Sequence, residues 1–329
     1  MTWSGVSVLV TGAGGFVGSH LVEALVARGA RVRALVRYTS RGEIGWLRWL
    51  PAAVLGEVDV RRGDLRDGAA LLQAMERCAV VFHLGALVSI PYSYQHPRDV
   101  VETNVVGTLN VLEAARHTQP RCVVQTSTSE VYGTAQTVPI TEQHPLHAQS
   151  PYAASKVGAD QLAESYHRCF GVPVTTVRPF NIYGPRQSAR AVIPTIMMQA
   201  LAGSAIRLGS LHPKRDFTFV QDTVRGFLLA AETREAIGHE MNLGSDDEIT
   251  IGDLANTILA LSGRSVPIVT EERRVRPTAS EVGRLHADNA LARRLLGWQP
   301  TVSLEDGLRQ TMAWMRKHLD LYRVDEYAV

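Results

Sequence analysis

The sequence is short of the features that mark several classes of protein. Cysteine is scarce: Cys78, Cys122 and Cys169 are an odd number without the paired spacing of a zinc site. We therefore predict buried, reduced thiols and no bound metal. No apolar run approaches the ~20 residues that span a membrane, and the N-terminus lacks a basic start and a long apolar stretch. These absences predict a cytoplasmic protein that does not associate with membranes.

An excess of charge of one sign is also missing. The 34 Lys and Arg residues nearly balance the 32 Asp and Glu residues, so the formal net charge is +2, and no block of five like charges occurs. Because a nucleic-acid-binding protein would carry a basic face, we expect no nucleic-acid partner. At 329 residues, 45% of them hydrophobic, the chain is long enough for one large or two ordinary globular domains. These properties favour chemistry on a small molecule.

Alternating strand and helix patterns predict the fold class. An apolar run at 6–10 is followed by glycines, by a helical pattern and by a second strand-like run at 31–37. The alternation continues to about residue 178, which predicts an α/β protein with a doubly wound parallel sheet, the Rossmann arrangement. After that point the segments are shorter and contain more proline and glycine. We expect a dinucleotide-binding domain at 1–178 with a return segment near 216–245, and a smaller, partly interleaved substrate lobe at 179–215 and 246–320.

A glycine-rich turn, VTGAGGFVGSH, follows the first predicted strand directly. Gly12, Gly15 and Gly18 are spaced by three residues and lie between that strand and a helix. Glycine lets the backbone approach a pyrophosphate, whose charge the N–H groups and dipole of the helix N-terminus then meet. Tight turns also use glycine, but this position between a strand and a helix favours dinucleotide binding.

The acidic residue that would bind the ribose 2′-hydroxyl of NAD is absent from the end of the second strand, where Val36 and Arg37 stand. Arg37 can face the 2′-phosphate of NADP or be a solvated arginine, so both cofactors stay open and NAD is our expectation. Farther along, Asp64 and Leu65 can bracket an adenine ring, or Asp64 can be an ordinary loop carboxylate.

Two later segments place polar side chains where a ligand is expected. TSTSEVYG at 126–133 follows a predicted central strand, and open α/β sheets bind ligands at the carboxyl ends of their strands. Tyr152 and Lys156 are four residues apart at the start of a predicted helix and therefore share one of its faces. Taken alone, the hydroxyls can simply cap a turn and the Tyr/Lys pair can simply meet water.

Together these segments resemble a known family, the extended short-chain dehydrogenase/reductases of the NAD-dependent epimerase/dehydratase type, which modify nucleotide sugars. The resemblance spans nearly the whole chain. It rests on the segments already described and on HLGA at 83–86, TNVVGTLN with Asn104, RPFNIYGP at 178–185, RDFTFVQD at 215–222 and RPTASEV at 276–282. TSTSEVYG, SPYAASK and GPRQSARAVIPT are most similar to bacterial 4,6-dehydratases that act on UDP-N-acetylglucosamine in nonulosonic-acid pathways.

The resemblance implies a set of catalytic residues and a reaction. Tyr152 is expected to take the proton of the sugar 4-hydroxyl, Lys156 to lower the pKa of Tyr152 and hold the nicotinamide ribose, and Thr128 to bond the same sugar oxygen. Once C4 is a ketone, Glu130 is expected to remove the C5 proton while the C6 hydroxyl leaves as water. Hydride returned to C6 then gives a 4-keto-6-deoxy sugar.

The motifs and the resemblance also give candidate binding residues. The candidate cofactor residues are Gly12, Gly15, Phe16, Val17, Gly18, Arg37, Asp64, Leu65, Leu84, Ala86, Tyr152 and Lys156. The candidate residues for the nucleotide sugar are Asn104, Ser129, Asn181, Arg215 and Arg276, with the arginines suited to phosphate oxygens unless they are solvated or ion-paired. Tyr92 and Tyr94 border the sugar or simply pack. The family resemblance further implies a homodimer.

Several alternatives to the dehydratase stay open. Ser129 stands where the common 4,6-dehydratase pattern has Asp, and nucleotide-sugar decarboxylases also carry Thr-Ser-Glu before Val-Tyr-Gly. The nearest alternative is a 4-epimerase, in which the 4-keto sugar turns over and takes hydride back on its other face; a UDP-uronic acid decarboxylase comes next. A catalytically silent dinucleotide sensor is the non-enzyme alternative, and the presence of Tyr152 with Lys156 argues against it.

Overall fold

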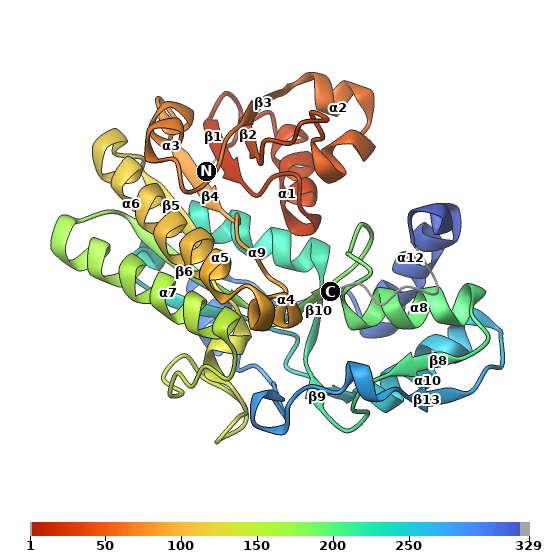
Figure 1. The fold of residues 1–329 in the computed structure, drawn as a ribbon. Helices are drawn as coiled ribbons and strands as arrows, with labels where there is room; N and C mark the ends of the chain where they lie inside the picture. Colours follow the sequence, from red (N-terminus) through yellow and green to blue (C-terminus); the bar gives the residue numbers. More distant parts are fainter. Residues whose placement is uncertain (1, 323–329) are drawn as a thin grey trace.

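A parallel sheet of seven strands forms the centre of the computed structural model, which describes residues 2–322 (Figure 1). Its strands lie in the order β11-β6-β5-β4-β1-β2-β3, and every neighbouring pair is parallel. The inner strands β1, β4, β5 and β6, rich in β-branched residues, are buried on both faces, as a sheet covered by helices requires, whereas the edge strand β3 is partly exposed. The strands are β1 (Ser7–Thr11), β2 (Arg31–Val36), β3 (Val58–Arg62), β4 (Val80–His83), β5 (Cys122–Thr126), β6 (Val174–Pro179) and β11 (Glu240–Leu243).

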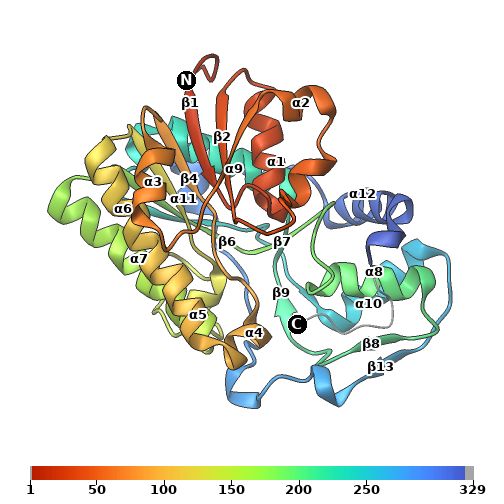
Figure 2. The ribbon, with the colours of Figure 1, turned by 45° about the horizontal axis from the view of Figure 1, so that its top comes forward.

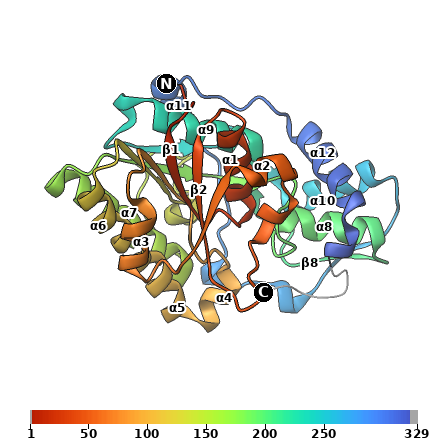
Figure 3. The same ribbon diagram turned by 90° about the horizontal axis from the view of Figure 1, so that it is seen from above.

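Helices cover both faces of the sheet, because alternate residues of each strand point to opposite sides. Val8 and Val10 of β1 belong to one core cluster, whereas Leu9 between them belongs to the other. Figure 3 shows α9 on one side of the strands and α3, α6 and α7 on the other. The covering helices are α1 (Phe16–Val26) and α9 (Val220–Glu232) on the first face, and α3 (Gly68–Met75), α6 (Gly107–Thr118) and α7 (Pro151–Phe170) on the second. The prediction of a doubly wound parallel sheet is confirmed.

A second group of elements lies beside the sheet (Figure 2). It contains three helices, α8 (Val192–Ala202), α10 (Ile251–Ser262) and α12 (Leu304–Lys317), and the parallel pair of β8 (Ile206–Leu208) with β13 (Ile268–Thr270). The shorter elements are α2 (Ala52–Gly56), α4 (Ile90–Gln95), α5 (Pro97–Val101), α11 (Ala290–Leu296), β7 (Asn181–Tyr183), β9 (Lys214–Arg215), β10 (Phe217–Phe219) and β12 (Ile249–Thr250).

The two lobes alternate along the chain. Helix α9 packs against β5 and β6, and β11 hydrogen-bonds to β6, although both elements follow the first helix of the second lobe in sequence. We therefore propose the division expected above, with a sheet lobe at 1–178 and 216–245 and a substrate lobe at 179–215 and 246–320.

The structure bears on two expectations drawn from composition, namely the lack of a membrane-spanning helix and the burial of the cysteines. No helix within residues 2–322 is long and apolar enough to cross a membrane. Cys78 and Cys122 are buried free thiols, but the prediction of burial is wrong for Cys169, which is exposed. Cys169 lies in the last turn of α7, beyond Ala163 and Tyr166, the last residues of that helix to be buried in the core.

Asp222 joins α9 to the segment that leads into α12. Its buried carboxylate accepts hydrogen bonds from the backbone N–H groups of Thr301 and Val302, from the Thr301 hydroxyl and from Arg225. Burial acts to raise the pKa of Asp222, but the hydrogen bonds from Arg225 and Thr301 outweigh it, so the pKa lies below its ordinary value. A depressed carboxyl pKa stabilises the folded protein at neutral pH.

We predict that Asp222→Asn lowers the free energy of unfolding by about 2 kcal/mol at neutral pH, because charged hydrogen bonds are lost. The difference from the wild type should shrink as the pH falls below about 3.9, where the unfolded aspartate is protonated, and on through its lower pKa in the folded protein. Denaturant unfolding across that pH range measures both effects. Exposed Asp320→Asn is the control and should change neither; a pH-independent loss in Asp222→Asn would contradict the electrostatic explanation.

Candidate active site

A cavity of about 1270 Å³ lies at the carboxyl ends of the sheet strands, between the two lobes. Residues that follow β1, β2, β3, β4, β5 and β6 line one wall, and residues 187–193 and 208–217 contribute to the other. A doubly wound sheet offers this position to ligands because the strand order changes direction there, between β1 and β4.

The glycine-rich turn is shaped for close approach by a ligand. Gly12 has a φ of +68°, and a Cβ atom there would lie 2.7 Å from the backbone nitrogen of Gly85. A Cβ atom at Gly18 would lie 2.2 Å from the carbonyl oxygen of Gly12. Gly15 caps α1 without a side-chain hydrogen bond, so the first N–H groups of the helix face the cavity without a side-chain partner. These residues, with Phe16 and Val17, fit the pyrophosphate of a dinucleotide.

The other candidate cofactor residues outside α7 line the same cavity: Arg37, Asp64, Leu65, Leu84 and Ala86. Asp64 is held by Arg66, with 2.7 Å between Oδ2 and Nη2. This hydrogen bond is the main cause of the lowered pKa of the Asp64 carboxyl. Asp64 is therefore a fixed carboxylate at the cavity edge.

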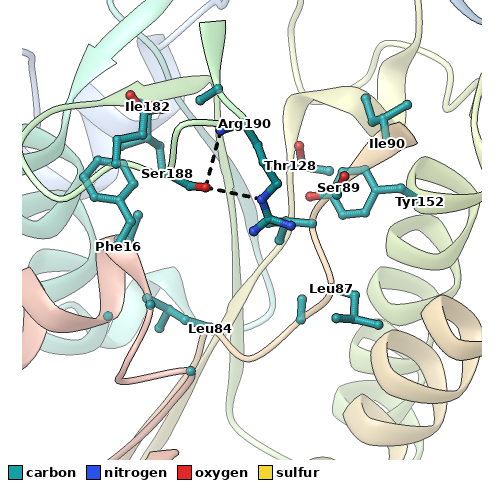
Figure 4. A pocket seen from close by; sticks show the side chains of 18 of the residues that line it. Phe16, Leu84, Leu87, Ser89, Ile90, Thr128, Tyr152, Ile182, Ser188 and Arg190 are labelled. Atoms are coloured by element: carbon teal, nitrogen blue, oxygen red, sulfur yellow. Dashed lines mark hydrogen bonds between the residues drawn. The ribbon is translucent and has the colours of Figure 1, made fainter. Parts of the chain in front are cut away.

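Local sequence positions the catalytic candidates. Helix α7 begins at Pro151, and the Ser150 hydroxyl accepts a hydrogen bond from the N–H of Ala153 at 3.1 Å. This start places Tyr152 in the first turn, where it lines the cavity and faces Thr128 (Figure 4). Lys156, one turn later, is buried and donates from Nζ to the carbonyl oxygen of Thr126 at 2.5 Å.

The electrostatics of this pair differ from the expectation. Burial raises the pKa of Tyr152 above its ordinary value; the nearby Thr128 hydroxyl acts to lower it, and the negative charges of Glu130 and Asp160 act to raise it further. The expected lowering by Lys156 is thus wrong as the net effect in this structure, because burial dominates. Burial also lowers the pKa of Lys156 to about 8, and Asp160 opposes that shift.

Three candidate substrate residues lie together with Ser129 on the cavity wall. The Asn181 side-chain oxygen is buried and has no hydrogen-bond partner within residues 2–322, which leaves it available to a ligand. Arg215 and Arg276 share one carboxylate oxygen, Oε1 of Glu281, at 3.3 and 3.5 Å. Glu281 therefore offsets part of the positive charge that the sequence assigns to this wall.

Asn104 is a correction to the predicted substrate set. Its side chain accepts from the N–H of Leu87 at 2.8 Å, and donates to the Leu87 carbonyl and to Ser155, each at 2.9 Å. Asn104 is buried and does not line the cavity, so it supports the wall at Leu87 instead. Tyr92 and Tyr94 do not line the cavity either: their hydroxyls contact Asp99 and Ser280.

Arg190 lines the cavity but was not among the candidate residues named from the sequence. Figure 4 shows its side chain extending into the pocket, between Phe16 and Ile182 on one side and Tyr152 and Thr128 on the other. Its Nε atom donates to the Ser188 hydroxyl at 3.3 Å. The motif GPRQSARAVIPT contains Arg190, but no periodicity in it indicates that this side chain would face the tyrosine.

Comparisons with known proteins agree with this geometry. The sequence model of the family described as GDP-mannose 4,6 dehydratase matches residues 9–311. The UDP-glucose 4-epimerase of Mycolicibacterium smegmatis is 34% identical over 94% of this chain and 98% of its own. The dTDP-glucose 4,6-dehydratase of Streptomyces griseus is 35% identical over 94% of both chains.

The solved structure of one relative contains a nicotinamide cofactor. The dTDP-glucose 4,6-dehydratase of Streptomyces venezuelae, a double mutant with NAD bound, has a TM-score of 0.83 and 31% identity, covering 96% of this chain and 98% of its own. The chain therefore belongs to the extended short-chain dehydrogenase/reductases of the NAD-dependent epimerase/dehydratase family, and it is an enzyme of the kind that acts on nucleotide sugars.

Proposed function

We propose that the enzyme is a nucleotide-sugar 4,6-dehydratase that acts on UDP-N-acetylglucosamine or a related NDP-hexose. The observation that carries the proposal is the position of Glu130, a carboxylate that lines the cavity with Thr128 and Tyr152. Its charge acts on both Tyr152 and Arg215, so it lies near the catalytic tyrosine and near the arginine assigned to the diphosphate. A carboxylate in that position is suited to acid–base chemistry on the sugar.

The proposed steps follow from these positions. Tyr152 takes the proton of the 4-hydroxyl, and Thr128 holds the sugar oxygen by a hydrogen bond. Bound NAD supplies the redox chemistry, accepting hydride from C4 and returning it to C6. Between these events Glu130 removes the proton from C5 and gives a proton to the departing C6 hydroxyl, so that C5–H and C6–O bonds break and water leaves. Addition of hydride at C6 and of a proton at C5 then completes the 4-keto-6-deoxy product; that proton balances the one that Tyr152 took from the 4-hydroxyl, so the enzyme returns to its starting state.

The lysine has a separate part in this scheme. Its ammonium group is held at the Thr126 carbonyl, at the base of the segment that carries Thr128 and Glu130. We assign Lys156 to the nicotinamide ribose and to electrostatic support of the Tyr152 phenolate. Because its pKa is about 8, Lys156 is still largely protonated at neutral pH and can give that support.

The decisive measurement is the mass of the product formed from UDP-N-acetylglucosamine without added reductant. We expect a product lighter by one water. Glu130→Gln should reduce its formation by roughly 10²- to 10⁴-fold, as expected for loss of a general acid–base group, while the substrate still reduces the bound cofactor. Tyr152→Phe should abolish both events.

Exposed Glu57→Gln is the matched control and should keep full activity. A product of unchanged mass but altered retention would make the enzyme a 4-epimerase. Carbon dioxide released from a UDP-uronic acid would make it a decarboxylase, and no conversion of any nucleotide sugar would leave a dinucleotide sensor.

We infer that the resident cofactor is NAD rather than NADP and that the enzyme works in the cytoplasm. The NAD-bound relative supports the first inference, and the free thiols of Cys78 and Cys122 suit a reducing compartment. Mass spectrometry of the nucleotide released from denatured protein should find NAD. Finding NADP would overturn the inference and assign Arg37 to the 2′-phosphate, in which case Arg37→Asp should release it.

We also propose a homodimer formed through α6, α7 and the helical segment before α6. Val101, Val106 and Phe170, at the ends of these helices, expose 44%, 40% and 49% of their surface, and an interface on these helices would cover them. Sedimentation equilibrium at micromolar concentration should give twice the mass of one chain. Val106→Asp should shift the equilibrium toward the monomer, and a monomeric wild type would contradict the proposal.

A further inference from the structure

A buried ion pair lies next to the catalytic residues of α7. Asp160 of α7 and Arg178 of β6 are 0% and 1% exposed, and Asp160 Oδ2 lies 3.1 Å from Arg178 Nε. Removing two charges from water costs several kcal/mol per ion before pairing, so the pair is costly unless its remaining groups are also satisfied. Because such a pair adds little to stability, its position next to the catalytic residues indicates a role in the reaction.

The arginine end of the pair is tied to two further parts of the sheet lobe. Arg178 donates from Nη1 to the Tyr132 hydroxyl at 3.1 Å, and Tyr132 donates to the Asn242 side chain at 2.8 Å. Its Nη2 atom lies 2.9 Å from Glu240 Oε2 on β11. The guanidinium is therefore fixed in position by groups on three chain segments, and the Asp160 carboxylate is fixed with it.

The aspartate end reaches the catalytic segment. The Ser127 hydroxyl donates to Asp160 Oδ2 at 2.7 Å. Ser127 lies between Thr126, which accepts from Lys156, and Thr128, which faces Tyr152 (Figure 4). Thr126 at the end of β5 and the next two residues, Ser127 and Thr128, thus all lie against α7.

The spacing along α7 explains how one helix makes all three contacts. Tyr152, Lys156 and Asp160 are four residues apart and share its buried face. Tyr152 faces Thr128 (Figure 4), Lys156 contacts Thr126, and Asp160 contacts Ser127 between them. The middle contact, Lys156, is itself a neighbour of the carboxylate: it interacts electrostatically with Asp160 on its own helix and with His83 on β4.

We propose that Asp160 is a positioning residue for the reaction: held by Arg178, its carboxylate fixes the segment 126–128 against α7, so that Thr128, Tyr152 and Lys156 keep one geometry. The inference rests on the proposed C4 oxidation, which is common to dehydratase and epimerase, and does not depend on which of the two follows. Asp160 lies outside the cavity and does not touch the substrate.

The charge of Asp160 adds a second, measurable effect. It acts to raise the pKa of Tyr152 and the pKa of Lys156. Burial in turn raises the pKa of Asp160, whereas Arg178, Ser127 and Lys156 act to lower it. Removing the charge should therefore lower the pKa of both catalytic groups, and both limbs of a pH–rate profile should move to lower pH.

The test is the rate at which bound cofactor is reduced on mixing the holoenzyme with UDP-N-acetylglucosamine, followed by absorbance from pH 6 to about 10. This range brackets the pKa of Lys156, about 8, and approaches the raised pKa of Tyr152. Asp160→Asn should reduce this rate by about 100-fold, the cost of misplacing reacting groups by about 1 Å. The KM and the cofactor content should stay near those of the wild type, and the profile should move to lower pH. Glu164→Gln, one turn farther along α7, is the matched control and should change neither rate nor profile.

Ser127→Ala separates positioning from charge and keeps the ion pair, so it serves if Asp160→Asn does not fold. It should reduce the rate by about 10-fold with no movement of the profile, because only the tether is lost. A wild-type rate in Ser127→Ala, or a folded Asp160→Asn with unchanged rate and profile, would overturn the proposal. Failure of the proposed function is a different result, namely no reduction of cofactor by the wild type with any nucleotide sugar.

Discussion

The contact between the first half of α7 and the carboxyl end of β5 is the constraint on which the site depends. It brings a phenol, an ammonium group and a carboxylate out of water onto one helix face, and each is paired with the strand segment opposite. Removing these groups from water costs free energy in the folded protein. The arrangement is stabilised because Arg178, held between β6 and β11, places a positive charge next to the Asp160 carboxylate.

The second requirement is that two lobes meet at this face. The sheet lobe supplies the glycine turn and the tyrosine, whereas the segment before α8 supplies Arg190 and strand β9 supplies Arg215. A dinucleotide on one wall and a nucleotide sugar on the other would then present C4 of the sugar to Tyr152. Glu281 offsets part of the positive charge of Arg215 and Arg276. The cavity can therefore accommodate an uncharged sugar together with a charged diphosphate.

The parts of this arrangement that depend on local sequence could be predicted. The glycine spacing, the alternation of strands and helices, and the Tyr152/Lys156 spacing each follow from backbone geometry over fewer than about twenty residues. Asn104 and Arg190 could not be placed, because the direction of each side chain depends on segments far away in the sequence. The shift in the pKa of Tyr152 was expected in the wrong direction for a related reason: spacing reveals a neighbouring charge, whereas burial is a property of the packed structure.

The route of the chain between lobes has a consequence for synthesis on the ribosome. The glycine turn and Tyr152 emerge early, but β11 supplies the edge of the sheet and carries Glu240, a partner of Arg178, and it emerges only after α8 and α9. The buried charges on the catalytic face of α7 therefore cannot all be paired until about three-quarters of the chain, 243 of 329 residues, has been synthesised. An N-terminal fragment that ends at the first lobe boundary would carry the catalytic motifs without the groups that hold them in place.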